Sequence, residues 1–137
     1  MNSHLNKVSQ WAMFRSTTAT AVYRAVPLVL RGQDATNSHT VSGGNVDLLV
    51  GRTYIISAGL PYESTKNMKA IEIQRSIDGG ASWVTIWGSG MSGATGGNSS
   101  GTSVTDVYTT TVPTKLRLYA SANSLAAGAW LRCEVMG

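Results

Sequence analysis

The sequence predicts an all-β domain, a jelly-roll-like antiparallel β-sandwich with a short N-terminal arm. Apolar residues alternate with polar ones along most of the chain, and clusters rich in Gly, Pro, Asn and Asp separate the alternating stretches. The length of 137 residues suits one domain with one core. We therefore expect an arm over residues 1–20 and a single sandwich over residues 21–137.

The first stretch, "NSHLNKVSQWAMFRS", has the spacing of a short amphipathic helix. Leu5, Val8 and Trp11 recur every three to four residues, and Phe14 extends this apolar set. Because the stretch precedes the first clear strand, we expect the sandwich to close without it. Leu5, Val8, Trp11 and Phe14 are then candidate capsid- or subunit-binding residues, with packing against the chain's own sandwich as the equal alternative.

The strands follow as alternating stretches. They are VYRAVPLVLRG, NVDLLV, RTYIISAG, KAIEIQRS, SWVTIWG, KLRLYAS and AWLRCEVM. Pro27 cannot donate to a ladder and indicates an edge strand, while Gly51 separates the second stretch from the third. Weaker strands near His39 and Val107 raise the expected total to about eight or nine. A jelly roll and an immunoglobulin-like sandwich both suit this number, and the single cysteine favours the jelly roll.

One motif stands between two of these strands. The stretch "SIDGGASW", Ser76 to Trp83, fills the pattern S-x-D-x-G-x-x-W and resembles the Asp box, a hairpin motif of sialidases and other propeller glycosidases. Its Asp-Gly-Gly centre tolerates the positive φ of a tight hairpin, and Asp78 can accept bonds from the turn's amides. The resemblance implies a structural turn of Ser76, Asp78, Gly80 and Trp83 without catalysis. A single copy excludes a propeller.

Candidate catalytic and metal-binding residues are few. Neither His4 nor His39 has a Cys, Asp or Glu at metal-ligand spacing, and Cys133 lies on an expected core face between Leu131 and Val135. Nothing selects two of the seven acidic residues as a glycosidase pair, and no phosphate-binding glycine loop opens a helix. We expect a non-enzyme with no catalytic residue, no cofactor and no metal.

Charge and hydropathy limit the partners. The net charge is +4, but the basic residues are scattered, and only Lys115, Arg117 and Tyr119 share one side of a strand. A solvated strand face is the simpler interpretation of these three. No apolar run approaches the roughly 18 residues of a membrane span, and the start lacks the apolar segment of a secretory signal. We expect synthesis in the cytoplasm and neither a nucleic-acid nor a membrane partner.

The stretch from Gly88 to Thr105 is rich in Gly, Ser and Thr and has almost no large side chains. Ordering so much glycine is entropically costly, so a core segment is excluded. Two interpretations remain open: a flexible hairpin connection, or a contact with a neighbouring subunit.

The chain as a whole resembles the bacteriophage virion accessory proteins, and among them the capsid decoration, or cement, proteins. The resemblance is carried by a small, one-cysteine, Ser/Thr/Gly-rich all-β chain with a polar N-terminal arm, one "DGGxSW" turn and a strand that ends almost at the terminus. It implies a virion protein that docks on the outside of the capsid and bridges capsomers, with the major capsid protein as partner. It transfers no functional residue.

Two other function classes stay open. One is a carbohydrate-binding module of a tail or fibre, with Trp87 or Trp130 as a sugar-stacking platform, and the other is a nucleic-acid binder. For the assembly we expect a homodimer or homotrimer, because four tryptophans and an edge strand at Pro27 provide more aromatic surface than a small core absorbs.

Overall fold

The computed structural model describes residues 10–33, 39–60, 69–92, 103–122 and 124–136. These ranges hold ten strands and no helix, so they hold no helix that could cross a membrane. The strands are β1 Trp11–Ser16, β2 Leu28–Gln33, β3 Thr40–Ser42, β4 Asn45–Leu48, β5 Thr53–Gly59, β6 Lys69–Ser76, β7 Val84–Ser92, β8 Ser103–Thr109, β9 Thr114–Ala122 and β10 Trp130–Val135.

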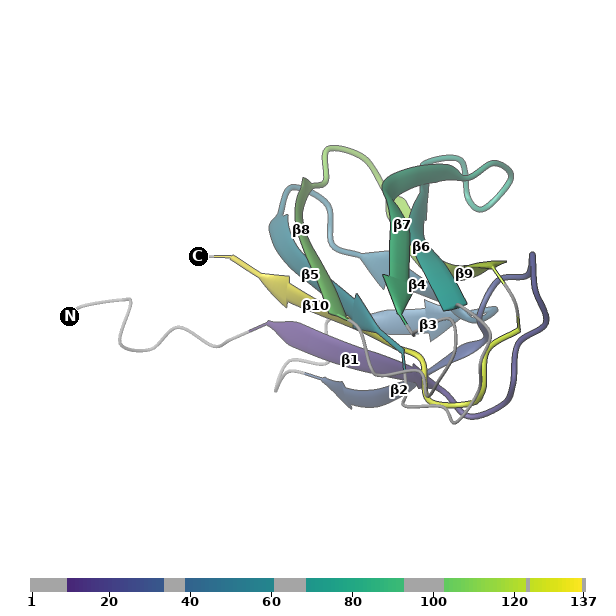
Figure 1. The fold of residues 1–137 in the computed structure, drawn as a ribbon. Helices are drawn as coiled ribbons and strands as arrows, with labels where there is room; N and C mark the ends of the chain where they lie inside the picture. Colours follow the sequence, from purple (N-terminus) through teal and green to yellow (C-terminus); the bar gives the residue numbers. More distant parts are fainter. Residues whose placement is uncertain (1–9, 34–38, 61–68, 93–102, 123, 137) are drawn as a thin grey trace.

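The strands form two five-stranded antiparallel sheets that pack face to face (Figure 1). The first sheet has the order β2-β1-β10-β5-β8, and the second sheet has the order β3-β4-β9-β6-β7. At the two sides of the sandwich β2 lies near β3 and β7 lies near β8. The expected fold class, an all-β jelly-roll sandwich, is confirmed.

The core lies between the sheets and is built by alternate residues of each strand. In β9, Leu116 and Leu118 are fully buried, and in β5, Tyr54 and Ile56 are fully buried. Removing such a side chain from water stabilises the fold by about 1.5–3 kcal/mol before the entropy of ordering is subtracted. The alternation in the sequence therefore identified these inward faces correctly.

Residues 11–16 correct the expected arm. They form β1, which pairs with β10 on one side and β2 on the other, so this part of the arm is a central strand and not a helix. Ala12 and Phe14 are 0% exposed in the core. Trp11 and Met13 are large and apolar but point outward. Apolar and polar residues therefore do not alternate in this stretch, and the sequence showed no sign of a strand. Leu5 and Val8 lie outside the described residues.

The edge position expected from Pro27 is found, because β2 begins at Leu28 and is the outermost strand of its sheet. Val26 and Leu28 are buried as expected, but Leu30 is 41% exposed. The register of the pairing between β1 and β2 shifts between Met13 and Phe14, so the irregularity in β2 lies between Leu30 and Gly32.

The prediction of a loop from Gly88 to Thr105 is wrong in part. Both ends of this stretch are strand, because β7 continues to Ser92 and β8 begins at Ser103. Residues 93–102 lie outside the described residues. His39, near which the sequence predicted a weak strand, directly precedes β3 and is 0% exposed. Its Nε2 lies 3.0 Å from the Tyr54 hydroxyl, which also accepts the amide of Leu49 at 2.8 Å. A core tyrosine thus holds the histidine inside.

Candidate functional site

The structure brings Ser76, Asp78, Gly80 and Trp83 together in one hairpin turn between β6 and β7. Ser76 Oγ donates to Asp78 Oδ1 at 2.7 Å and accepts the Gly80 amide at 2.8 Å. Asp78 Oδ1 also accepts the Ser82 amide at 2.9 Å, and Trp83 Nε1 donates to the Gly80 carbonyl at 3.1 Å. Gly80 has a φ of 97°, which a side chain would strain. The turn therefore fixes the position of the Trp83 ring.

Asp78 serves this turn as an ionised acceptor. Hydrogen bonds from Ser76 and then Ser82 lower the pKa of Asp78 from 3.8 to about 2. The carboxyl consequently has no proton to donate near neutral pH, and a general-acid role for it is excluded.

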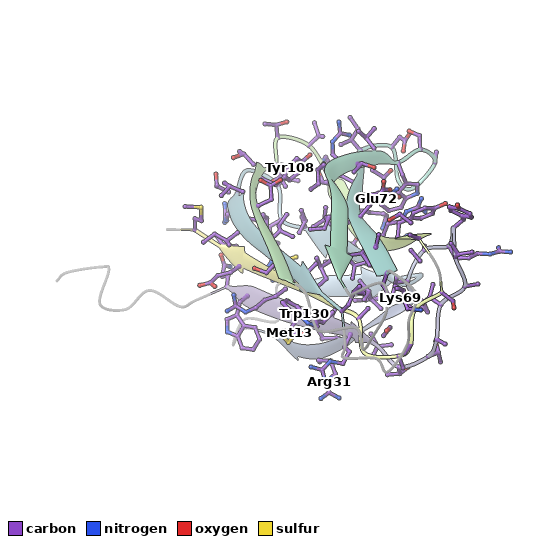
Figure 2. All side chains as sticks on the ribbon, in the orientation of Figure 1. Met13, Arg31, Lys69, Glu72, Tyr108 and Trp130 are labelled. Atoms are coloured by element: carbon purple, nitrogen blue, oxygen red, sulfur yellow. The ribbon has the colours of Figure 1, made fainter. Side chains whose placement is uncertain are left out.

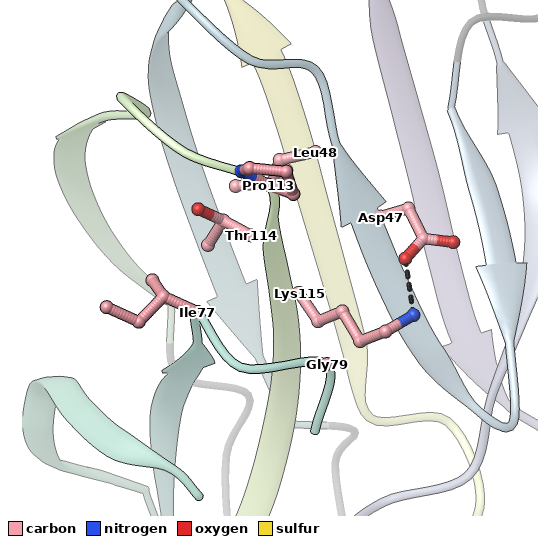
Figure 3. Close-up of a pocket in the computed structure, with 7 residues that line it drawn as sticks. All are labelled: Asp47, Leu48, Ile77, Gly79, Pro113, Thr114 and Lys115. Carbon is pink, nitrogen blue, oxygen red and sulfur yellow. Dashed lines mark hydrogen bonds and ion pairs between the residues drawn. The ribbon is translucent and has the colours of Figure 1, made fainter. Parts of the chain in front are cut away.

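A pocket of about 330 Å³ lies beside the turn, where β9 begins (Figure 3). It is lined by Asp47, Leu48, Ile77, Gly79, Pro113, Thr114 and Lys115. Ile77 and Gly79 belong to the turn, so the motif forms one wall. At the rim Lys115 Nζ lies 2.6 Å from Asp47 Oδ1, and Ser42 Oγ donates to Asp47 Oδ2. The volume is at the lower end of the range of small-ligand sites.

Next to the pocket, the outer face of the second sheet carries an arginine between two aromatic rings. The Arg117 guanidinium carbon lies 4.3 Å from the Trp83 ring centroid and 5.3 Å from that of Tyr119. Arg117 Nε donates to Gln74 Oε1 at 2.8 Å, and Gln74 Nε2 donates to Glu72 Oε2 at 2.9 Å. We call Glu72, Gln74, Trp83, Arg117 and Tyr119 the Arg117 cluster.

Burial lowers the pKa of Arg117 below its ordinary value, and the guanidinium stays cationic at neutral pH. The contact with two ring faces is favourable for a partly desolvated cation. Since Arg117 and Gln74 face one another across β9 and β6, the cluster is held by sheet register as well as by hydrogen bonds. The side chains are therefore ordered before any ligand arrives.

The outer face of the first sheet carries more large apolar side chains, and we call it the apolar face. These side chains are Trp11, Met13, Ile55, Val107 and Trp130. One cross-strand row there runs from Trp11 through Glu134 and Ile55 to Val107. Val107 is 56% exposed. Figure 2 places Met13 and Trp130 over the β1 and β10 part of this sheet, away from Glu72 on the second sheet.

Trp11, suggested as a capsid- or subunit-binding residue, and Trp130, suggested as a sugar-stacking platform, both lie half-buried on the apolar face. The Arg132 guanidinium carbon is 5.5 Å from the Trp11 ring centroid, and its Nη1 pairs with Glu134 Oε2 at 2.5 Å. Phe14, suggested with them, is a core residue and offers no surface contact. The side chain of Trp87 lies outside the described residues.

In the described ranges, the side chains suited to catalysis or metal binding are either buried or bonded in a turn, or they lie far from one another. Cys133 is fully buried, and desolvation raises its pKa to about 12, so it holds no thiolate at neutral pH. Among the described residues there is no group of three or more His, Cys, Asp and Glu that could hold a metal ion. Among the described residues, neither Cys133 nor Asp78 is therefore in a state suited to nucleophilic or general-acid chemistry.

The Arg117 cluster and the pocket escaped the sequence analysis. Alternation placed Lys115, Arg117 and Tyr119 on one side of a strand correctly, but the pairing of β9 with β6 and β4 decides their neighbours. Trp83 was assigned to the turn alone. The adjacent hairpin motif is the one sequence signal that could have indicated the Arg117 cluster, because the motif brings its tryptophan back towards the sheet.

No protein-family model matches the chain, and no curated protein matches its sequence. Among solved structures, the chain is similar to Eiger TNF from S. frugiperda, with a TM-score of 0.73 and 9% identity over 96% of this chain and 94% of that one. Murine APRIL at pH 5.0 gives a TM-score of 0.67 and 9% identity over 93% and 99%. The globular domain of the zebrafish complement 1qA protein gives 0.57 and 15% over 93% and 95%. These likenesses establish the jelly-roll fold of TNF and C1q-type domains.

Proposed function

We propose that this chain is a non-catalytic structural protein of a bacteriophage virion, which binds the outside of the capsid as a homodimer or homotrimer and cements the shell. The major capsid protein is the proposed partner, and the virion surface is the proposed location. The resemblance of the whole chain to decoration proteins supports the capsid, and the apolar face supports the oligomer.

The apolar face is the observation that carries the oligomer. Trp11, Met13 and Trp130 are only half-buried, and Val107 is largely exposed. Aromatic and Met side chains gathered on one face are characteristic of an interface.

An oligomer also explains how a small protein can hold a shell. Each subunit contributes one modest contact, and linked contacts multiply in strength when the geometry allows them to engage together. Closed symmetry suits the symmetry positions of a capsid. Residues 1–9, with Leu5 and Val8, remain the proposed capsid contact, because the strand that follows them belongs to the sandwich.

Light scattering tests the oligomer, and we expect a dimer or trimer that Trp130→Ala weakens by about 1–3 kcal/mol of association free energy. Tyr119→Ala, on the opposite outer face, is the matched control and should leave the mass unchanged. A monomer at high protein concentration would contradict the proposal.

Sedimentation with emptied phage capsids tests the partner. The deletion must stop at residue 9, because a longer one removes β1. We expect the shortened chain to stay folded and to lose capsid binding. If it decorates capsids at full occupancy, the contact lies elsewhere, and if the full-length chain never sediments with capsids, the cement function is wrong.

A further inference from the structure

We infer that the outer face of the second sheet binds a short, uncharged oligosaccharide, with the Arg117 cluster as platform and the neighbouring pocket as the place for one sugar ring. Trp83 and Tyr119 provide the aromatic surface on either side of Arg117, and Arg117 and Glu72, held in place by the buried Gln74, provide the hydrogen bonds. This site is separate from the apolar face, so it does not depend on the proposed oligomer or on the capsid.

The first argument is the pairing of aromatic surface with planar polar groups. A sugar ring has an apolar C–H face and a rim of hydroxyls, and it needs both kinds of partner side by side. Trp83 and Tyr119 are half-buried aromatic residues that flank Arg117, and the guanidinium lies 4.3 Å from the Trp83 centroid. Aromatic residues with a polar handle suit a ligand that is apolar on one side and wet on the other.

The second argument is preorganisation. Glu72, Gln74 and Arg117 are linked by two hydrogen bonds of 2.9 and 2.8 Å, and Thr85 Oγ1 reaches Glu72 Oε2 at 3.4 Å. A carboxylate and a guanidinium that are held in place by a buried amide can meet neighbouring hydroxyls with little further loss of side-chain freedom. Trp83 is fixed as well, by its bond to the Gly80 carbonyl.

The third argument is charge, which decides the class of ligand. Lys115 pairs with Asp47 at 2.6 Å, and Arg117 is linked through Gln74 to Glu72. Two cations are thus balanced by two carboxylates on the same face. A nucleic acid or another polyanion needs unneutralised lysines and arginines, so this face favours an uncharged ligand.

The fourth argument is shape. Lys115 at the pocket and Tyr119 in the cluster are four residues apart on one side of β9, which is roughly 13 Å at 3.3 Å per residue, a length that a short oligosaccharide can span. Beside Tyr119, Tyr23 donates its amide to the Ala120 carbonyl at 2.8 Å, has a φ of 59° and is 68% exposed. A bulky residue held in the left-handed region is costly and is often functional.

The test is a titration of the full chain with uncharged trisaccharides, namely maltotriose, cellotriose, chitotriose and mannotriose, followed by ¹H–¹⁵N NMR. We expect at least one to shift the Trp83 indole and Arg117 Nε resonances together with amides of residues 114–119. Arg117→Ala should weaken that binding at least tenfold. Arg132→Ala is the matched control, because Arg132 contacts Trp11 in a similar way on the apolar face.

Other outcomes overturn the inference. These are no shift with any of the four sugars, shifts confined to the apolar face, or equal loss of binding in both arginine variants. A single-stranded oligonucleotide serves as the polyanion probe. If it binds this face with steep salt dependence while the sugars do not, the face is a nucleic-acid site. Tyr119→Phe keeps the ring and should retain most of the affinity, and a native-like amide spectrum of Arg117→Ala excludes misfolding as the cause of its weaker binding.

Discussion

The two outer faces of the sandwich contain the same pair of groups, an arginine over a tryptophan, in opposite settings. Around Arg117 and Trp83 the neighbouring polar groups bond to one another, and the charges balance within the second sheet. Around Arg132 and Trp11, Arg132 pairs with Glu134, and the half-buried side chains of Met13 and Trp130 lie on the same face. In the first setting the polar groups are held together by hydrogen bonds, whereas in the second a salt bridge lies among large, half-buried apolar side chains, the surface that we propose as the subunit contact. A cation near an aromatic ring therefore indicates little until its surroundings are known.

The largest expected effect separates the two sides of β1. Phe14→Ala removes a fully buried ring and should lower the free energy of unfolding by about 3–5 kcal/mol, a large share of the 5–15 kcal/mol typical of a domain. Met13→Ala, on the apolar face of the same strand, should cost the monomer less than about 1 kcal/mol. Urea denaturation at low protein concentration measures both. Equal losses of unfolding free energy in the two variants would mean that Phe14 does not face the core while Met13 faces outward.

A smaller effect concerns the turn that positions Trp83. Ser76 is 1% exposed, and Ser76→Ala leaves the Gly80 amide without its acceptor, which should cost about 1 kcal/mol of unfolding free energy. Loss of the cation–π contact should accompany it, seen as a change in Trp83 fluorescence. Unchanged stability and fluorescence would show that the turn does not need this hydroxyl.

Acid pH tests the same turn through Asp78. Its pKa is lowered to about 2 in the folded chain, so its contribution to stability is present above pH 3.8 and is lost as the pH falls towards 2. Asp78→Asn should remove this part of the pH dependence. The measurement is the melting temperature between pH 2 and 5, and parallel curves for the two proteins would contradict the shift.

The smallest effect is expected for the ion pair at the pocket. The side chains of Lys115 and Asp47 are 25% and 38% exposed, and Asp47→Asn should change the free energy of unfolding by only about 0.2–1 kcal/mol. The difference should shrink in high salt, because exposed pairs are screened. A large, salt-independent loss of stability would show that the Lys115–Asp47 pair is not an ordinary exposed ion pair.

The sequence predicted most of the sandwich, because inward and outward residues alternate in β4, β5, β6, β9 and β10. It failed at β1, where Trp11 and Met13 are apolar on the outward side and the spacing to Val8 and Leu5 imitated a helix. The candidate site was predictable only in parts. Local chemistry identified the turn at Asp78, but the meeting of Arg117 with Gln74 depends on register between strands far apart in the chain.

The buried thiol gives the chain a built-in reporter. Cys133 is its one cysteine, it is fully buried in β10, and its raised pKa of about 12 leaves almost no thiolate for a reagent to attack. Labelling near pH 8 must therefore wait for the central strands to separate, and its rate measures that opening. Without any engineered probe, the time course of modification can compare how often the free chain and the assembled chain open.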